Sequence, residues 1–397
     1  MEKLRARHIK RINDVGMNFI RSYINEFPWN ERLIGIKGSR GVGKTTLLLQ
    51  YIKKTYQLSE KVIYISLDDL YFTEHKLIDF ADTFVKNGGT HIFIDEVHKY
   101  DNWAIEIKNM YDIYEELKIV FTGSSLLEIN KASVDLSRRA LIFEMQGLSF
   151  REFLELKYQY KFNTIDINEI ITNHLTIASE ITLKIKPFQY FSEYLQIGYY
   201  PFFQQEKDFY YQRLREVVNM IIEIELPLLR KIEVSKINKV KQLLYIIAQS
   251  VPFKPNISSL SAKTSISRNT LVEYIKSLDD SNLIQTINKN TFGVSQLQKP
   301  EKIYLENTNL AYAITYKEPN IGNIRETFFY NQLKKKYKLT YPDKGDFMVD
   351  NKYVFEVGGQ NKTSKQISNI KNAFIAADGI EYGIKNKIPL WLFGMLY

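Results

Sequence analysis

Three glycines, a lysine and two threonines lie close together in the stretch GSRGVGKTT. The stretch matches the pattern G-x-x-x-x-G-K-[ST], in which backbone N–H groups and the start of a helix hold a chain of phosphates. Glycine suits such a loop because a Cβ atom would block close approach to a phosphate or the positive φ angles of the turn. The pattern predicts a phosphate-binding loop made of Gly38, Ser39, Arg40, Gly41, Val42, Gly43, Lys44, Thr45 and Thr46.

Two side chains of this loop have separate predicted roles. We expect the Lys44 ammonium group to reach the β- and γ-phosphate oxygens, and the Thr45 hydroxyl to be a ligand of Mg²⁺. The apolar run RLIGIK precedes the loop and the helical pattern TTLLLQYIKK follows it. A strand before the loop and a helix after it are the context that this motif needs, which disfavours a glycine-rich turn without a ligand.

Two adjacent carboxylates follow the apolar run in HIFIDEVHK. We expect Asp95 to orient Mg²⁺ through water, and Glu96, one residue further out, to polarise an attacking water. The alternative is a charged pair that opens a loop. His98 has no second histidine at ligand spacing, so we expect a hydrogen-bonding or structural role for it and no zinc site.

Further polar residues follow the next apolar run, in KIVFTGSSLL and LSRRALIFEM. Thr122 and Ser124 should lie at the same sheet edge as Asp95, where their hydroxyls could sense the γ-phosphate or the water. The alternative is that a serine here caps a helix. Either Arg138 or Arg139 could act on the γ-phosphate of a neighbouring molecule and stabilise transition-state charge, and a solvated surface position is the alternative for each.

The elements that must position these side chains alternate along the first 150 residues. Apolar runs predict strands at 32–37, 61–67, 91–94 and 118–122. Helical periodicity predicts helices at 45–56, 74–86 and 103–114. Strands that alternate with helices indicate a parallel α/β sheet with both faces covered.

Composition narrows the class of protein further. A chain of 397 residues is expected to hold two or three domains. The absence of cysteine excludes disulfides and thiolate metal sites and fits a reducing compartment. No secretory signal or membrane-spanning run is recognisable, so we expect a cytoplasmic protein without a membrane partner. The net charge of +9 would suit a nucleic-acid partner, but the lysines are spread over the chain.

Six segments together resemble a large prokaryotic family of AAA-type ATPases of the ASCE class: KGSRGVGKTTLL, FIDEVHKYDNW, FTGSSLL, LSRR, GLSFREFL and YLQIGYYP. In that family an AAA domain leads into a helical region, a winged helix and a C-terminal segment related to PD-(D/E)xK nucleases. The resemblance implies ATP and Mg²⁺ as cofactors, with Lys44, Thr45, Asp95 and Glu96 at the motif positions. It implies no biological role.

The predicted fold is therefore an α/β P-loop NTPase sheet with a helical lid, followed by a winged-helix module and a small α+β nuclease-like domain. The expected boundaries are 1–150 for the AAA-type domain, 151–234 for the lid, 235–310 for the winged helix and 311–397 for the nuclease-like domain. The aromatic run PFQYFSEYLQIGYYPFF is expected to form the core of the lid, because large aromatic side chains dominate cores.

The predicted winged helix contains a candidate recognition helix in SRNTLVEYIKSLDDSNLI, capped by Ser267. Leu271, Ile275 and Leu278 recur on one face and leave Arg268, with its polar neighbours, near the other. The first residues of a recognition helix contact base edges, and INKNTFGVSQL could form the wing. Duplex DNA binding and a purely structural or protein-binding role both remain open, because acidic residues offset the positive charge of this helix.

The C-terminal segment has a helix predicted to begin at Glu326 and a hairpin in GDFMVDNKYVFEVGG. A three-residue loop at 350–352 would pair Phe347 with Phe355 and place Asp346 opposite Glu356. Glu326, Asp346 and Glu356 are thus a candidate second metal site. The nuclease pattern expects a lysine where this chain has Gly358, and Lys362 is the nearest substitute, so nuclease activity is doubtful.

These observations predict a Mg²⁺-dependent ATP-binding and ATP-hydrolysing protein that couples its nucleotide state to the C-terminal modules. One alternative is a nucleotide-gated DNA-binding switch with little turnover, and another is an ATP-regulated nuclease. The predicted partner is ATP, and duplex DNA and a second copy of the chain in a homo-oligomer are left open.

Overall fold

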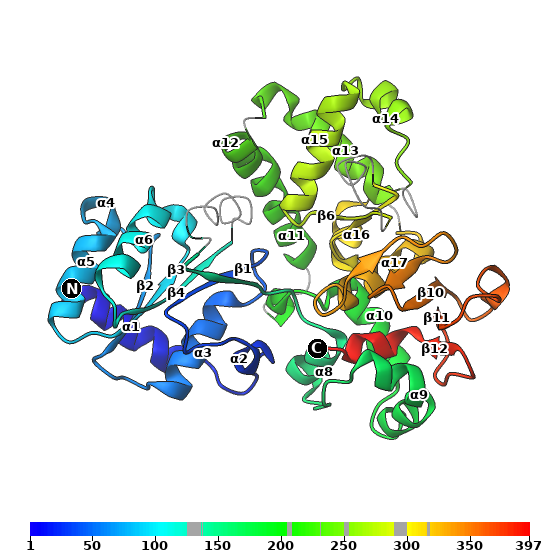
Figure 1. The fold of residues 1–397 in the computed structure, drawn as a ribbon, viewed down its shortest axis with the longest axis horizontal. Helices are drawn as coiled ribbons and strands as arrows, with labels where there is room; N and C mark the ends of the chain where they lie inside the picture. Colours follow the sequence, from blue (N-terminus) through cyan, green and yellow to red (C-terminus); the bar gives the residue numbers. More distant parts are fainter. Residues whose placement is uncertain are drawn as a thin grey trace. The chain divides into compact units, whose positions relative to one another are not determined.

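The computed structural model describes residues 1–124, 136, 138–204, 209–230, 232–249, 254–289, 300–315 and 318–397. The described chain forms two compact units, Met1–Gly147 and Leu148–Tyr397. Each unit has a five-stranded sheet of its own (Figure 1). None of the described helices is both long and apolar enough to cross a membrane.

The sheet of the first unit is parallel throughout and has the strand order β2-β3-β4-β1-β5. Its strands are β1 (Leu33–Lys37), β2 (Val62–Ser66), β3 (His91–Asp95), β4 (Lys118–Gly123) and β5 (Leu141–Glu144). The four strands predicted in this region are confirmed, whereas β5, a short and partly exposed edge strand, was not predicted. Because all strands run in the same direction, the residues that follow β1, β3 and β4 meet at one edge.

The first unit contains the helices α1 (Glu2–Asp14), α2 (Tyr23–Glu26), α3 (Lys44–Thr55), α4 (Tyr71–Glu74), α5 (Leu77–Lys86) and α6 (Trp103–Ile113). The predicted start of a helix at Glu74 was wrong, because His75 and Lys76 are extended and separate α4 from α5. The first two helices, α1 and α2, were not predicted.

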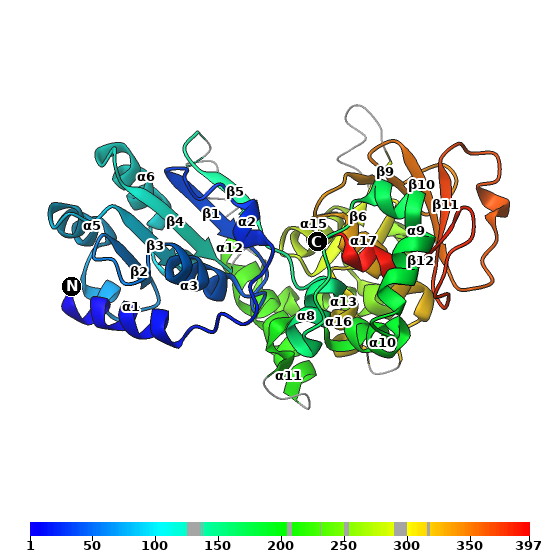
Figure 2. The ribbon, with the colours of Figure 1, turned by 90° about the horizontal axis from the view of Figure 1, so that it is seen from below.

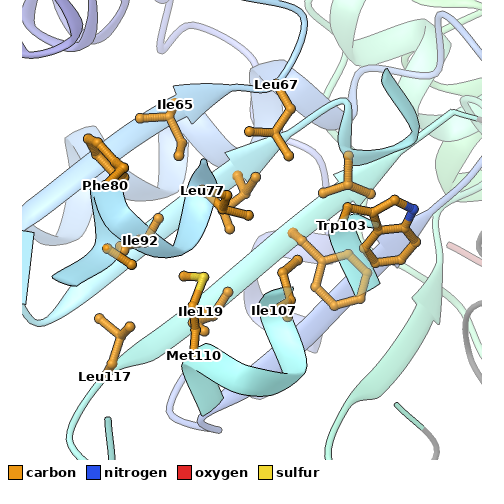
Figure 3. Packing of buried hydrophobic residues seen from close by; sticks show 14 of the residues in the cluster. Ile65, Leu67, Leu77, Phe80, Ile92, Trp103, Ile107, Met110, Leu117 and Ile119 are labelled. Atoms are coloured by element: carbon orange, nitrogen blue, oxygen red, sulfur yellow. The ribbon is translucent and has the colours of Figure 1, made fainter. Parts of the chain in front are cut away.

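The core of the first unit lies between the sheet and the helices α5 and α6. Figure 3 shows apolar side chains of the strands, such as Ile92 and Ile119, packed against Leu77 and Phe80 of α5 and Met110 of α6. Figure 2 shows α3 on the other side of the sheet, where the ring of Phe93 lies 6.1 Å from that of Tyr51. With both faces covered, the strands are as continuously apolar as a buried parallel sheet requires.

Helix α1 covers the outer edge of the sheet at β2. The Arg5 guanidinium donates to the carbonyl oxygen of Val62 at 2.6 Å, and His8 Nδ1 accepts from the backbone N–H of Tyr64 at 3.0 Å. Burial, assisted by the charge of Arg5, lowers the pKa of His8 to about 4, so its ring is neutral at pH 7 and can accept this bond. Side chains of α1 thus satisfy backbone groups that an edge strand would otherwise leave unpaired.

The second unit begins with the helices α8 (Phe150–Tyr158), α9 (Ile167–Thr182), α10 (Pro187–Ile197), α11 (Tyr210–Met220) and α12 (Leu226–Arg230). The predicted aromatic core is confirmed: Phe191 and Tyr194 of α10 are buried, with Phe191 centred 5.3 Å from Phe150 of α8. Phe191 also contacts Phe328 of a later helix, at 4.9 Å. The aromatic cluster therefore joins the helical region to the C-terminal part of the chain.

The next elements are α13 (Ile237–Gln249), α14 (Ile257–Thr264), α15 (Arg268–Asp280) and an antiparallel pair, β6 (Ile284–Ile287) with β7 (Lys302–Leu305). The predicted cap of α15 is confirmed, because the Ser267 side chain accepts from the backbone N–H of Thr270. Most of the predicted wing at 287–297 lies outside the described residues.

Two α-helices follow, α16 (Thr308–Ile314) and α17 (Ile321–Leu333). The last sheet contains β8 (Leu339–Thr340), β9 (Phe347–Val349), β10 (Tyr353–Gly358), β11 (Ala373–Ala377) and β12 (Lys387–Pro389), in the order β12-β11-β10-β9-β8. The predicted hairpin register is confirmed, because Phe347 pairs with Phe355. The predicted helix start at Glu326 was wrong, because α17 is capped by Asn320 and begins at Ile321, five residues before Glu326.

Candidate nucleotide-binding site

The loop between β1 and α3 has the backbone geometry for which glycine was predicted. Gly41 and Gly43 have φ angles of 84° and 98°, in the left-handed region that other residues rarely adopt. A Cβ atom added to Gly38 would overlap the carbonyl oxygen of Met145. Of the other loop residues, Val42 is fully buried, Ser39 and Arg40 are half-buried, and Thr46 is exposed.

The Lys44 side chain lies inside this loop. Lys44 is the first residue of α3, and its ammonium group donates to the carbonyl oxygens of Gly38 at 2.7 Å and Ser39 at 3.0 Å. The residue is almost fully buried. The loop therefore encloses a positive charge at the start of a helix, where backbone N–H groups also favour an anion.

A buried arginine that sequence reasoning missed holds the loop from outside. The Arg21 guanidinium donates to the carbonyl oxygens of Val42 at 3.0 Å, Gln146 at 3.0 Å and Gly147 at 2.7 Å. These bonds join the phosphate loop to the chain that follows β5. A single arginine in a segment without a motif offers no signal of this role before the fold is known.

The predicted metal-binding pair lies together at the edge of the sheet. The Thr45 hydroxyl donates to Asp95 Oδ2 at 2.6 Å. This hydrogen bond connects the start of α3 with the end of β3. Mg²⁺ is usually held by one or two protein oxygens together with phosphates and waters. This donor pair fits that pattern, and no group of three or more His, Cys, Asp or Glu side chains among the described residues could hold a metal alone.

Asp95 accepts three further hydrogen bonds that fix its carboxylate. Thr122 donates to Oδ1 from β4, the backbone N–H of Glu96 donates to Oδ1 at 3.1 Å, and the Tyr64 hydroxyl donates to Oδ2 at 2.9 Å. Tyr64 belongs to β2, and its hydrogen bond to Asp95 was not predicted from the sequence. Burial and the charge of Asp95 raise the pKa of Tyr64, so it remains a donor at neutral pH.

Glu96 stands directly after β3 in a conformation that costs energy. Its φ is 54°, in the left-handed region. For a residue with a side chain this conformation costs about 1–3 kcal/mol, and such strained residues cluster at functional sites. The Ser124 hydroxyl donates to Glu96 Oε1 at 3.2 Å. Burial, followed by the negative charge of Asp95, raises the pKa of Glu96, whereas Lys44 and Arg40 act against that rise. A carboxylate with a raised pKa is a better proton acceptor.

His98 lies next to Glu96 in the short 3₁₀ turn Val97–Lys99. Its side chain is 5% exposed, and Nε2 is 3.4 Å from Glu96 Oε2. Burial and the charges of Lys99, Arg40 and Lys44 lower the pKa of His98 to about 3, so the ring is neutral at pH 7.

The two candidate arginines have different surroundings. Arg139 makes a two-pronged ion pair with Asp112, at 2.8 and 2.9 Å. Arg138 is exposed and makes no hydrogen bond or ion pair with any other described residue. Arg139 is thus held by an ion pair within the unit, whereas Arg138 has no partner among the described residues.

The second candidate metal site is arranged differently from the first. Lys302 of β7 is buried, and its ammonium group donates to Glu326 Oε2 at 2.9 Å and to Asp346 Oδ1 at 2.8 Å. Burial alone would lower the pKa of Lys302, but the two carboxylates outweigh it, and the net pKa is raised. A cation supplied by the chain therefore already bridges the two carboxylates.

The third carboxylate of that set, Glu356, is also paired with a lysine. Lys362 Nζ lies 2.6 Å from Glu356 Oε1. The aliphatic part of Lys362 lies over Gly358, at 2.8 Å from where a Cβ atom of that glycine would be. Lys362 thus lies beside Gly358, the position where the nuclease pattern would place a lysine.

The first unit has a phosphate loop after β1, a hydroxyl–carboxylate pair across α3 and β3, and the strand order β2-β3-β4-β1-β5, which together are consistent with the core of a P-loop NTPase. Residues 30–154 match the profile of a family described as "AAA domain". Residues 188–320 match a family described as a domain of unknown function.

The chain is also similar over most of its length to individual proteins. An uncharacterized protein of Methanocaldococcus jannaschii is 27% identical, over 96% of this chain and 88% of that protein. Among solved structures, a Walker-type ATPase of Pyrococcus abyssi is 14% identical with a TM-score of 0.41, covering 78% of this chain and 95% of that chain. DnaA of Aquifex aeolicus, with bound AMPPCP, is 14% identical with a TM-score of 0.26, covering 65% and 84%.

Proposed function

We propose that the protein is a Mg²⁺-dependent ATPase. The observation that carries the proposal is the meeting of Thr45, Asp95 and Glu96 at the sheet edge beside a glycine loop that encloses Lys44. These are the groups that a P-loop enzyme needs for phosphate, metal and water. The match of residues 30–154 to an AAA domain supports adenine as the base.

Each residue then has one role in hydrolysis. Lys44 leaves the carbonyl oxygens of Gly38 and Ser39 and donates to the phosphates. Thr45 and Asp95 would hold Mg²⁺, which neutralises phosphate charge when it is bound. Glu96 accepts a proton from the attacking water, and Ser124 keeps its carboxylate oriented. We further propose that the nucleotide state of the first unit controls the second.

Release of inorganic phosphate by the purified chain tests this proposal. Turnover should require both ATP and Mg²⁺, should stop when EDTA removes the metal, and should be much lower with GTP. A well-folded protein that binds ATP and Mg²⁺ but releases no phosphate would contradict the proposed activity.

We expect Arg138, and not Arg139, to act on the nucleotide of a neighbouring copy. Arg138→Ala should lower turnover by about a thousandfold, the usual contribution of an arginine finger, with ATP affinity unchanged. Arg139→Ala is the matched control, because it removes only an ion pair with Asp112 that solvent screens. Steady-state assays measure the turnover of both variants, over a range of protein concentrations because the proposed arginine acts between copies of the chain. Equal losses in the two variants would contradict the assignment.

Duplex DNA binding by a winged helix is a second candidate function. The observation that favours it is the exposed face of α15, which presents Arg268, Asn269 and Lys276, while Leu271 and Ile275 pack inward. An exposed face of this kind supports the proposal, because a recognition helix contacts bases from the major groove.

Arg268→Ala should weaken duplex binding by about 1–3 kcal/mol if this helix reads DNA. Fluorescence anisotropy at several salt concentrations measures the affinity and its salt dependence. Lys86→Ala changes an exposed lysine on α5 of the first unit and should leave the affinity unchanged. Binding that is insensitive to Arg268→Ala would leave α15 with a packing role only.

A metal-dependent nuclease receives mixed support from the second unit. Lys362 beside Glu356 favours it, because a lysine is present where the pattern needs one. Lys302 opposes it, because the ammonium group already neutralises the carboxylates of Glu326 and Asp346. We therefore do not propose DNA cleavage as the function of this unit.

A further inference from the structure

His98 and Glu96 are neighbours, and each has buried polar atoms without a hydrogen-bond partner among the described residues. Both ring nitrogens of His98 and Glu96 Oε2 are buried and make no hydrogen bond to any described residue. Leaving a buried polar atom unpaired is unfavourable, because the atom has lost its hydrogen bonds to water. The ring nitrogen Nε2 and the carboxylate oxygen Oε2 are complementary, because an N–H at Nε2 can donate to the oxygen. Each group is therefore the available partner for the other.

The distance between the two groups is slightly longer than that of a formed hydrogen bond. Nε2 and Oε2 are 3.4 Å apart, and N–H···O bonds are typically about 2.7–3.2 Å long. Hydrogen bonds of catalytic groups are often long without a ligand and shorten when the substrate is bound. A movement of a few tenths of an ångström would complete this one.

The backbone is shaped to bring these two side chains together. They are two residues apart, a spacing at which side chains do not face each other on a helix. The left-handed φ of Glu96 ends β3, and the 3₁₀ turn Val97–Lys99 starts immediately after it. The strained residue and the turn thus place the His98 ring beside the Glu96 carboxylate.

We infer that His98 is a positioning residue that donates from Nε2 to Glu96 Oε2 and, together with Ser124 on Oε1, fixes the carboxylate toward the attacking water. The inference rests on the proposed ATPase function. Its physical reason is that a glutamate side chain has three rotatable bonds, and a proton acceptor must lie within hydrogen-bond reach of the water. Two anchors, one on each oxygen, leave the carboxylate one orientation.

This role predicts a change in turnover and not in nucleotide binding. A misplacement of about 1 Å in a catalytic group can cost roughly a hundredfold in rate. His98 makes no hydrogen bond to the phosphate loop within the described part of the chain. We therefore expect His98→Leu to lower kcat by about ten- to a hundredfold, with the affinity for ATP within about twofold of the unmodified protein.

Two polar variants test whether the hydrogen-bond donor must lie at the position of Nε2, or whether any donor on this side chain is sufficient. The amide of His98→Gln reaches as far as Nε2, whereas that of His98→Asn reaches only as far as Nδ1. We expect His98→Gln to keep kcat within about threefold and His98→Asn to be as slow as His98→Leu. If His98→Leu does not fold, the comparison of Gln with Asn still decides, because both are small polar changes. A kcat for Asn equal to or above that for Gln would overturn the inference.

A double-mutant cycle tests whether His98 acts through Glu96. In single-turnover assays, His98→Leu should slow the Glu96→Gln protein by much less than it slows the unmodified protein, because the group it positions is gone. Equal slowing in both backgrounds would overturn the inference. Failure of the proposed function gives a different result, because the unmodified protein itself would then show no turnover.

Discussion

Glu96→Gln should bind ATP with nearly unchanged affinity and hydrolyse it at least a hundredfold more slowly, because general base catalysis contributes about 10²- to 10⁴-fold. The amide has the shape of the carboxylate but cannot accept a proton from water. The amide oxygen can still accept a hydrogen bond from the Ser124 hydroxyl, which donates to Glu96 Oε1 at 3.2 Å in the unmodified protein. The local structure should therefore persist. Phosphate release and equilibrium binding of a fluorescent ATP analogue measure the two effects separately.

The matched control is Glu115→Gln, which makes the same chemical change at an exposed position of the first unit. It should leave both turnover and affinity unchanged. If Glu96→Gln retained full turnover, another group would have to accept the proton, and the role of Glu96 would be wrong.

Lys44→Ala should weaken ATP binding severely. Removing one partner of a desolvated charge pair costs about 2–5 kcal/mol, which is roughly 30-fold to 4,000-fold in affinity. The effect should be large here because Lys44 is almost fully buried and its ammonium group lies inside the loop. Titration with an ATP analogue in the presence of Mg²⁺ measures the loss.

Lys54→Ala, on the exposed side of the same helix, is the control for charge and for helix stability. Its affinity for ATP should match that of the unmodified protein. Thermal unfolding of both variants should show that each is folded. A Lys44→Ala protein that bound ATP normally would mean that the loop holds something other than a phosphate chain.

The parts of the site that sequence could predict are those set by local patterns. The glycine loop, the strand that precedes it and the acidic pair at the end of β3 depend on residues close together in the chain. The hairpin register of β9 and β10 could be predicted in the same way, because only one loop length gathers the apolar side chains on one face.

The parts that sequence could not predict depend on residues far apart in the chain. Arg21 holds the carbonyl oxygen of Val42, and Tyr64 reaches Asp95 from the neighbouring strand. Neither stands in a motif, and both roles follow only from the strand order. The bridge from Lys302 to Glu326 and Asp346 is of the same kind, because β7 and α17 must first pack together.

Calorimetric titration of the folded protein with ATP and saturating Mg²⁺ tests the central claim most directly. The claim is that the loop around Lys44 holds a triphosphate whose metal is bound by Thr45 and Asp95. The account predicts one nucleotide bound per chain and an affinity at least about 30-fold lower for Lys44→Ala. Absence of binding to the unmodified, folded protein would contradict it.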